Sequence, residues 1–491
     1  MVATLWIDVE DLFEYFRNNA RPTGIQRLVF ELYQVLQQRD DGRGLVRFVR
    51  HDPVRGSLRI VQWAEVAGLF TRVAAEIVPP QAQPGAIRPH SPVRQFFREW
   101  THRLPAVLRI RVTEVMLSQV KALQAWGKLF ALLGRCMLDS PRWLAQRYRA
   151  DADRTSSGAA VSRQSFADLA KPGDVLLVLG APWSHPNYGA LVHAQRERYG
   201  LRIALLIHDL IPLRRPEWCE RGLVRLFRAW FDGVFPLADH LFAVSKATAS
   251  DVEHYAREHG VALSGPVIPV PIGTGFGAKA PAVPVPPTAR LPAPGSYALI
   301  VSTIEVRKNH LLLFRVWRRL LEELPHDQVP ILVFAGRAGW LVGDLMEQIA
   351  NTDHLGGKLV VIPSPTDAEL TALYQGCLFT LFPSLFEGWG LPVTESLAFG
   401  KPCLISNRTS LPEAGGALAR SFDPDNLHDA YAVILEAITD RAGLAAWEAQ
   451  IRREFKPVPW SATVDALLRG LDHPLASAIV PDEVLEMPAA P

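Results

Sequence analysis

The sequence predicts an α/β protein made of two Rossmann-like, doubly wound domains, each with a mostly parallel sheet between layers of helices. In both halves of the chain, short continuous apolar runs alternate with segments of helical periodicity, which is typical of buried parallel strands joined by crossover helices. A proline-rich stretch at 273–295 separates the halves and can form neither a helix nor a sheet ladder. The 491 residues are enough for two or three domains.

These observations set the expected domain boundaries. The first domain covers 1–275 and contains a helical, basic insertion at about 92–150. A linker at 276–295 leads to the second domain, 296–456.

In the first domain, three residues are placed where a ligand is expected. Apolar runs predict strands at 4–9, 46–51, 58–62, 175–179, 203–207, 241–244 and 266–270. Gly24 stands directly before a helix predicted at 25–38, where a glycine lets a ligand approach the backbone. His208 and Asp209 directly follow the strand at 203–207. The carboxyl ends of parallel strands face the ligand crevice of a doubly wound sheet, so these side chains are candidates for the site.

The second domain repeats this pattern and adds two cations. Strands are expected at 297–302, 331–335, 359–362, 379–382 and 403–406. Arg307 and Lys308 lie just beyond the first of these strands. At that position their charges can neutralise a diphosphate leaving group without a metal ion.

The stretch 381–402 combines a strand, a glycine-bearing loop and a short helix that Pro392 is expected to open. Free backbone N–H groups and the helix dipole at such an N-terminus bind anions. Glu387 and Glu395 flank this position and can accept hydrogen bonds from sugar hydroxyls. A phosphate beside sugar hydroxyls describes a nucleotide-sugar.

The run F-E-G-W-G-L-P-V-T-E, which holds Glu387 and Glu395, resembles the E-x7-E motif of glycosyltransferase family 4, retaining enzymes with the two-domain GT-B fold. The resemblance is strong over 200–470, patchy over 1–80 and nearly absent over 85–165. It implies a helix at 457–472 that crosses back to the first domain. The Pro- and Ala-containing composition of the end of the chain predicts a mobile tail at 473–491.

The same resemblance implies the roles of the candidate residues. Glu395 would hold the nucleotide ribose, Glu387 the sugar hydroxyls and Gly24 would face the donor diphosphate. The expected catalytic residues are His208, Asp209, Arg307, Lys308 and Glu387. The expected donor-binding residues are Gly24, Arg307, Lys308, Glu387, Gly388, Trp389, Gly390, Leu391 and Glu395. No metal and no other cofactor is expected, so the enzyme would be a metal-independent hexosyltransferase.

The substrate expectations also follow from the resemblance. Bacterial members with "TGI.R" and "HDL.PL" segments commonly build lipopolysaccharide, capsule or exopolysaccharide. We therefore expect a mannosyltransferase that uses GDP-mannose and a polyprenyl-diphosphate-linked oligosaccharide, with UDP-glucose and dTDP-rhamnose still open as donors.

Three alternatives to a GT-B glycosyltransferase belong to other classes of protein. A catalytically silent protein that binds nucleotide-sugar as a scaffold would tolerate loss of Arg307, Lys308, Glu387 or His208, and all four are present. A metal-dependent GT-A enzyme needs an Asp-x-Asp motif, and Asp151–Asp153 fits only formally because no predicted strand precedes it. A dinucleotide dehydrogenase is disfavoured because no predicted strand leads into G-x-G-x-x-G.

Composition limits the location and the partners. A net charge of +2 does not indicate a nucleic-acid partner. The four cysteines form no C-x-x-C pair, so neither a zinc site nor a disulfide framework is indicated. The N-terminus carries acids where a signal peptide needs basic residues. No run of about 18 apolar residues occurs, so no membrane span is expected. These features predict a cytoplasmic protein. The segment 94–149 holds 11 Lys/Arg and three Asp/Glu, which suits either peripheral contact with an anionic membrane or a packed helical hairpin.

Overall fold

The computed structural model describes residues 2–19, 22–52, 56–75, 165–183, 185, 187–275 and 291–476. Residues 1–77 and 165–491 form one compact unit. The predicted insertion at 92–150 and most of the predicted linker lie outside the described residues.

The first domain is built on a seven-stranded sheet with the order β3-β2-β1-β4-β5-β6-β7. Among the strands that the structure describes in this sheet, only β2 and β3 pair antiparallel. The strands are β1 (Leu5–Asp8), β2 (Val46–Asp52), β3 (Ser57–Val61), β4 (Val175–Val178), β5 (Arg202–Ile207), β6 (His240–Ala243) and β7 (Val267–Pro269). Because β1 lies between β2 and β4, the strand order reverses beside it.

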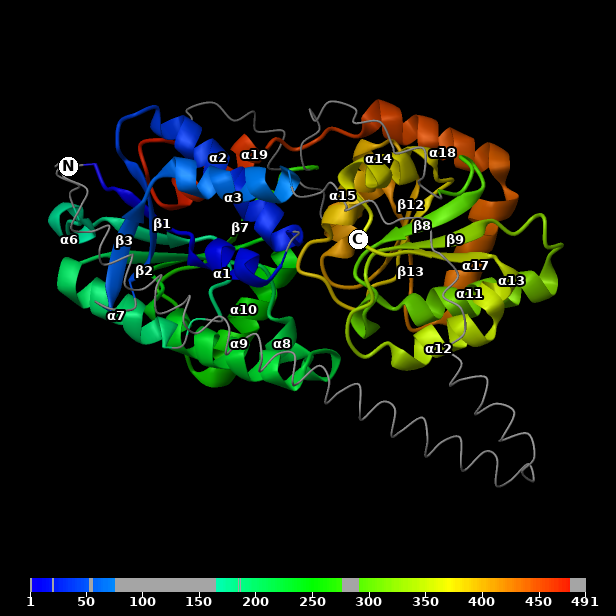
Figure 1. Cartoon of the computed structure of the whole chain (residues 1–491), viewed down its shortest axis with the longest axis horizontal. Helices are drawn as coiled ribbons and strands as arrows, with labels where there is room; N and C mark the ends of the chain where they lie inside the picture. The colour runs from blue at the N-terminus through cyan, green and yellow to red at the C-terminus, as the bar shows by residue number, and fades with distance from the viewer. Residues whose placement is uncertain are drawn as a thin grey trace, which may run out of the picture. The chain divides into compact units, whose positions relative to one another are not determined.

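Helices cover both faces of this sheet (Figure 1). They are α1 (Glu10–Asn18), α2 (Gly24–Asp40), α3 (Trp63–Ala75), α6 (Phe166–Leu169), α7 (Tyr188–Tyr199), α8 (Ile211–Arg214), α9 (Arg221–Val234) and α10 (Lys246–His259). Successive side chains of a strand point to opposite faces, so Leu5 and Ile7 join the apolar cluster under α2, whereas Trp6 joins the cluster under α7 and α9.

The second domain has a six-stranded parallel sheet with the order β10-β9-β8-β11-β12-β13. Its strands are β8 (Tyr297–Val301), β9 (Ile331–Ala335), β10 (Leu359–Ile362), β11 (Thr380–Phe382), β12 (Cys403–Ser406) and β13 (Arg420–Phe422). Its helices are α11 (His310–Glu323), α12 (Gly343–Asn351), α13 (Asp353–Gly356), α14 (Asp367–Gly376), α15 (Leu391–Ala398), α16 (Leu411–Gly415), α17 (Leu427–Thr439) and α18 (Arg441–Glu454). The strand order reverses at β8, between β9 and β11. The two sheets confirm the predicted fold class of two Rossmann-like, doubly wound domains.

The last helix of the described residues, α19 (Trp460–Gly470), packs on the first domain, as predicted for 457–472. Its buried Leu467 and Leu468 belong to the same apolar cluster as Leu5, and Thr463 Oγ1 accepts a hydrogen bond from Gly273 N at 3.1 Å.

The prediction of a mobile tail from 473 onward is wrong for its first residues. His473 is only 4% exposed and its Nε2 donates to the carbonyl oxygen of Ala3 at 2.8 Å. Leu475 is buried in the cluster under α2. These contacts tie the chain beyond α19 to the first strand, and residues 477–491 lie outside the described part.

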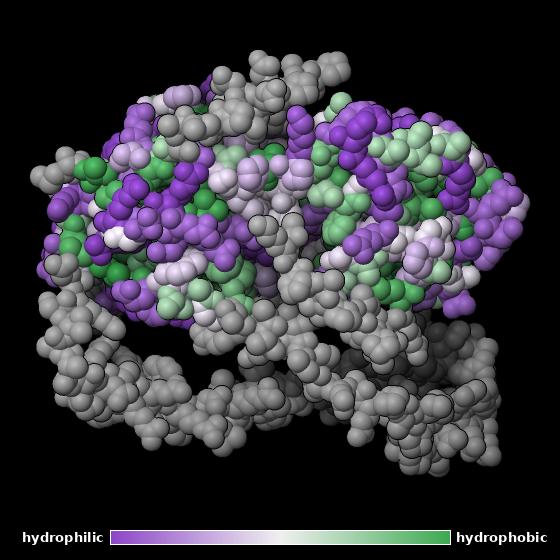
Figure 2. Space-filling view, turned by 90° about the horizontal axis from the view of Figure 1, so that it is seen from above, coloured by the Kyte–Doolittle hydropathy of each residue, from purple (hydrophilic) through white to green (hydrophobic). Residues whose placement is uncertain are grey.

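On the face shown in Figure 2, hydrophobic and hydrophilic residues are interspersed over the described surface. Among the helices that the structure describes, none combines the length and the apolar character needed to cross a membrane.

Candidate functional site

The loop from β11 to α15 is shaped by two glycines and a proline. Gly390 has a φ of +113°, a conformation that side-chain-bearing residues rarely adopt, and it caps the N-terminus of α15. The helix begins at Leu391, one residue before the predicted start at Pro392, which lies in the first turn where its missing N–H costs nothing. The loop therefore leads directly to backbone N–H groups suited to an anion.

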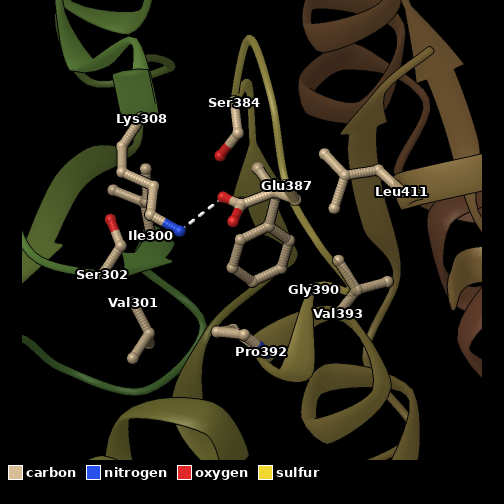
Figure 3. A pocket seen from close by; sticks show the side chains of 11 residues that line it. Ile300, Val301, Ser302, Lys308, Ser384, Glu387, Gly390, Pro392, Val393 and Leu411 are labelled. Atoms are coloured by element: carbon tan, nitrogen blue, oxygen red, sulfur yellow. Dashed lines mark hydrogen bonds and ion pairs between the residues drawn. The ribbon is translucent and has the colours of Figure 1, made fainter. Parts of the chain in front are cut away.

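The two predicted cations meet Glu387 beside this helix. Arg307 Nη1 lies 2.8 Å from Glu387 Oε2. Figure 3 shows the ion pair between Lys308 Nζ and Glu387 Oε1. Arg307 also contacts Glu305 Oε1 at 2.6 Å and donates to the carbonyl oxygen of Phe386 at 2.6 Å. Two cations and two carboxylates thus form one compact charge network at the end of β8.

The charges of this network shift the pKa values of its members. Burial by itself raises the pKa of Glu387, but Arg307 and Lys308 outweigh it and lower that pKa to about 2. Burial lowers the pKa of Lys308, partly offset by Glu387. Burial also opposes the charge of Arg307, yet Glu387 and Glu305 raise its pKa overall. Glu387 is therefore ionised at neutral pH and forms ion pairs with both cations.

The network borders a pocket at the reversal of strand order between β8 and β11. Its walls include Val301 at the end of β8, Ser302 just after it, Lys308, Glu387, and Pro392 from α15 (Figure 3). Ligands of doubly wound sheets bind at this topological position.

Glu395 lies one helical turn into α15 and is half-buried. Burial raises its pKa, and Tyr374 of α14 opposes this by donating to Oε2 at 2.9 Å. The tyrosine thus fixes the orientation of the carboxylate that was predicted to hold a ribose.

His208 and Asp209 follow β5, as predicted. His208 Nε2 lies 2.8 Å from the carbonyl oxygen of Leu179, which can only accept, so Nε2 carries the proton. Burial lowers the pKa of His208 to about 4, so at neutral pH the ring is uncharged and Nδ1 is an acceptor. Burial raises the pKa of Asp209, opposed mainly by the charge of Arg307.

The loop at 387–391 of the second domain lies against Gly24 and His208, two of the residues predicted to face the ligand from the first domain. A Cβ on Gly388 would lie 1.9 Å from the carbonyl oxygen of His208, and a Cβ on Gly24 would lie 3.3 Å from Leu391 Cδ1. Gly24 is the first residue of α2, which Thr23 and Gln26 cap. Trp389 is half-buried and packs against the apolar clusters of both domains.

Two residues that hold this loop, Thr409 and Ser410, are not among those predicted from the sequence. Thr409 Oγ1 accepts a hydrogen bond from Glu387 N at 3.0 Å. Ser410 Oγ lies 3.0 Å from the carbonyl oxygen of Glu387 and 2.8 Å from that of Trp389, and donates to them. Both residues lie just after the carboxyl end of β12, and this position could have identified them as candidates for the site.

Residues 289–454 match the family model of glycosyl transferases group 1. The matched segment contains the charge network, the loop at 387–391 and Glu395.

Curated relatives extend the similarity. The chain is 28% identical over 282 residues to the serotype-specific mannosyltransferase WbdA of Escherichia coli, covering 55% of this chain and 34% of that protein. It is 33% identical over 144 residues to the O-antigen chain mannosyltransferase B of Escherichia coli, covering 29% of this chain and 37% of the relative. A D-inositol 3-phosphate glycosyltransferase of Nocardiopsis dassonvillei is 28% identical, covering 61% of this chain and 70% of the relative. The match thus spans about a third of the length of both mannosyltransferases.

Proposed function

We propose that the chain is a retaining, metal-independent glycosyltransferase that moves mannose from GDP-mannose to a lipid-linked oligosaccharide in polysaccharide synthesis. The observation that carries this proposal is the pairing of Arg307 and Lys308 with Glu387 beside the N-terminus of α15. The match of 289–454 to glycosyl transferases group 1 supports it.

The charge network suits a diphosphate leaving group. As the bond between the sugar C1 and the donor phosphate oxygen breaks, negative charge develops on the diphosphate. Arg307 and Lys308 would stabilise that charge with the N–H groups at the start of α15. The acceptor oxygen forms the new bond to C1 on the same face, and its proton passes to the departing phosphate.

The carboxylates suit the uncharged parts of the donor. Glu395, oriented by Tyr374, would accept from the ribose hydroxyls, and Glu387 from hydroxyls of the sugar. Neutral His208 would likewise accept from a hydroxyl through Nδ1, rather than donate to a phosphate. Asp209 would lie beside the reacting centre, within the electrostatic reach of Arg307.

Mannose is the proposed sugar because both Escherichia coli relatives are named mannosyltransferases. The polyprenyl-diphosphate carrier and a position on the cytoplasmic face of a membrane, with peripheral contact, belong to the same proposal.

A donor screen tests it. Purified full-length protein is incubated with GDP-mannose, UDP-glucose or dTDP-rhamnose and a soluble mannoside acceptor, and nucleotide release is measured. We expect GDP release from GDP-mannose and, by NMR, a product with the donor's anomeric configuration. Binding of a nucleotide-sugar without turnover of any donor would instead support the silent scaffold.

A further inference from the structure

Ser302 lies directly after β8, and its side chain lines the same pocket as Lys308 and Glu387 (Figure 3). We propose that the Ser302 hydroxyl is a further donor-binding group, which donates a hydrogen bond to the diphosphate of the nucleotide-sugar, and that His310 is the positioning residue that directs it. The inference rests on the proposed function and adds two residues to the donor site.

The pocket suits a single oxygen atom rather than a whole ring. It has room for a group of about the size of one water molecule, between the end of β8 and the first turn of α15. A non-bridging phosphate oxygen has that size, and the N–H groups and dipole at the start of a helix favour its charge. Lys308 adds a cation to the lining. An oxygen of the donor diphosphate is therefore the group that fits.

The backbone holds Ser302 at this position. Ser302 N donates to the carbonyl oxygen of Ala335, the last residue of β9, at 3.2 Å. The carbonyl oxygen of Ser302 packs so closely against Gly336 that a Cβ on the glycine would lie 1.9 Å away. Since both backbone groups are fixed, only the side-chain torsions of Ser302 remain free, and a hydrogen bond to the hydroxyl can set them.

His310, the first residue of α11, provides that hydrogen bond. Its Nε2 lies 3.3 Å from Ser302 Oγ, and its ring packs edge-on against Phe334 with the centroids 4.7 Å apart. His310 is only 1% exposed. Burial, reinforced by the charge of Lys308, lowers the pKa of His310 to about 3. At neutral pH the ring is therefore uncharged and carries one proton.

The position of this proton decides the direction in which Ser302 donates. His310 Nδ1 is buried and has no hydrogen-bond partner among the residues that the structure describes. A proton on Nδ1 would leave a buried N–H unpaired, and unpaired buried N–H groups are rarer than unpaired acceptors. We therefore assign the proton to Nε2, which donates to Ser302 Oγ. The hydroxyl proton of Ser302 is then available to a ligand.

The second hydroxyl in the pocket lining, that of Ser384, hydrogen-bonds to Glu387. In the proposed function Glu387 accepts from hydroxyls of the sugar, so the phosphate beside it is the one bonded to the sugar. Ser302 lines the same pocket as Glu387. Its hydroxyl would therefore contact this sugar-side phosphate rather than the phosphate bonded to the ribose.

Nucleotide binding tests the assignment without turnover. The Kd values of GDP and GMP are measured by calorimetry on the full chain, for the wild type, Ser302→Ala, His310→Phe and His310→Gln. GMP lacks the phosphate that is bonded to the sugar in the donor. UDP with UMP, and dTDP with dTMP, are measured in parallel. Ser421→Ala, at an exposed serine of β13, is the control, and thermal unfolding checks that each variant is folded.

Ser302→Ala should raise the Kd of GDP by about tenfold or more, because the lost hydrogen bond has a charged acceptor, and should change that of GMP less than about twofold. His310→Phe keeps a ring without its nitrogens and should raise the Kd of GDP about threefold. His310→Gln restores an N–H near the position of Nε2 and should keep the wild-type Kd. Nitrogen NMR of the histidine-labelled chain should show the proton of His310 on Nε2.

The outcomes separate this inference from the proposed function. An unchanged Kd of GDP in Ser302→Ala, or an equal loss for GDP and GMP, would overturn the phosphate contact. A proton on His310 Nδ1, or wild-type binding by His310→Phe, would overturn the positioning role. None of these results affects the proposed function, which is rejected instead if no nucleotide-sugar is turned over. A wild type that binds none of the three nucleoside diphosphates would reject both.

Discussion

Gly388 packs against the backbone of His208 so closely that a Cβ on the glycine would lie 1.9 Å from the histidine carbonyl oxygen. The same glycine accepts a hydrogen bond from Thr248 Oγ1 through its carbonyl at 3.1 Å. The position next to Glu387 is therefore restricted to glycine by a neighbour that is distant in sequence. Gly388 also connects the loop that carries Glu387 to His208 and Asp209, the candidates that follow β5.

Gly388→Ala is accordingly expected to impair transfer. The methyl group must displace backbone, which costs about 1–3 kcal/mol in an overpacked site and moves Glu387 and Trp389. We expect kcat/KM to fall at least about tenfold, measured as nucleotide release, together with a lower Tm. Gly343→Ala, where a Cβ meets nothing within 4 Å, is the control. Equal kinetics of the two variants would contradict this close packing.

Arg307→Ala and Lys308→Ala should each reduce turnover strongly. Loss of a charge-assisted contact to a developing anion raises the barrier by about 2.7–4 kcal/mol, which is roughly a hundred- to thousandfold in rate. Arg408→Ala removes an exposed arginine that pairs with Asp423 and Asp425, and it should leave turnover unchanged. Near-normal kcat in both site variants would remove these cations from the diphosphate role.

Turnover is expected to persist in EDTA. Arg307, Lys308 and the N–H groups at the start of α15 would stabilise the negative charge of the leaving group without a metal ion. Chelation should therefore leave the rate of nucleotide release within about twofold. A rate that vanishes with EDTA and returns with magnesium or manganese would show that a metal ion takes part.

Asp11→Asn should stabilise the protein above neutral pH. Burial, reinforced by Asp8 and Glu10 and partly opposed by the Ala181 N–H, raises the pKa of Asp11 from 3.8 to about 7. Between these values the folded chain keeps a proton that the unfolded chain releases, so this group makes stability fall as the pH rises through the interval.

Asparagine imitates the protonated acid. At pH 8 the free energy of unfolding should therefore rise by up to about 4 kcal/mol, with little change near pH 4. Urea unfolding at both pH values measures this, with the exposed Asp327→Asn as control. An equal effect at both pH values would show that the proton of Asp11 is not responsible.

Peripheral membrane contact remains a prediction for 94–149, which lies outside the described residues. Each basic residue near an anionic surface contributes about 1 kcal/mol, and salt screens it. The protein should co-sediment with anionic liposomes at low salt and be released at high salt. Changing Arg98, Arg103, Arg109 and Arg111 to glutamine should weaken this binding but spare transfer to a soluble acceptor. A chain that ignores such liposomes would support the packed hairpin.

The sequence by itself determined most of the strands, although not β13, and the positions of the candidate residues just after them. Apolar runs of strand length are a local property, and side chains just after parallel strands must gather at one edge of a sheet. His208 and Arg307 could therefore be assigned from position alone. The spacing of Glu387 and Glu395 across the start of a helix is equally local.

Only the tertiary structure decided how these groups pair. The hydrogen bond to Leu179 sets the proton of His208, and Ser410 holds the loop from 21 and 23 positions away. The ring of Trp183, after β4, meets that of Phe227 on α9, a contact that no local pattern encodes. Likewise, the composition of the tail gave no sign that His473 would bond to Ala3. Contacts of this kind depend on which faces meet after folding, whereas periodicity reports only which face of an element is apolar.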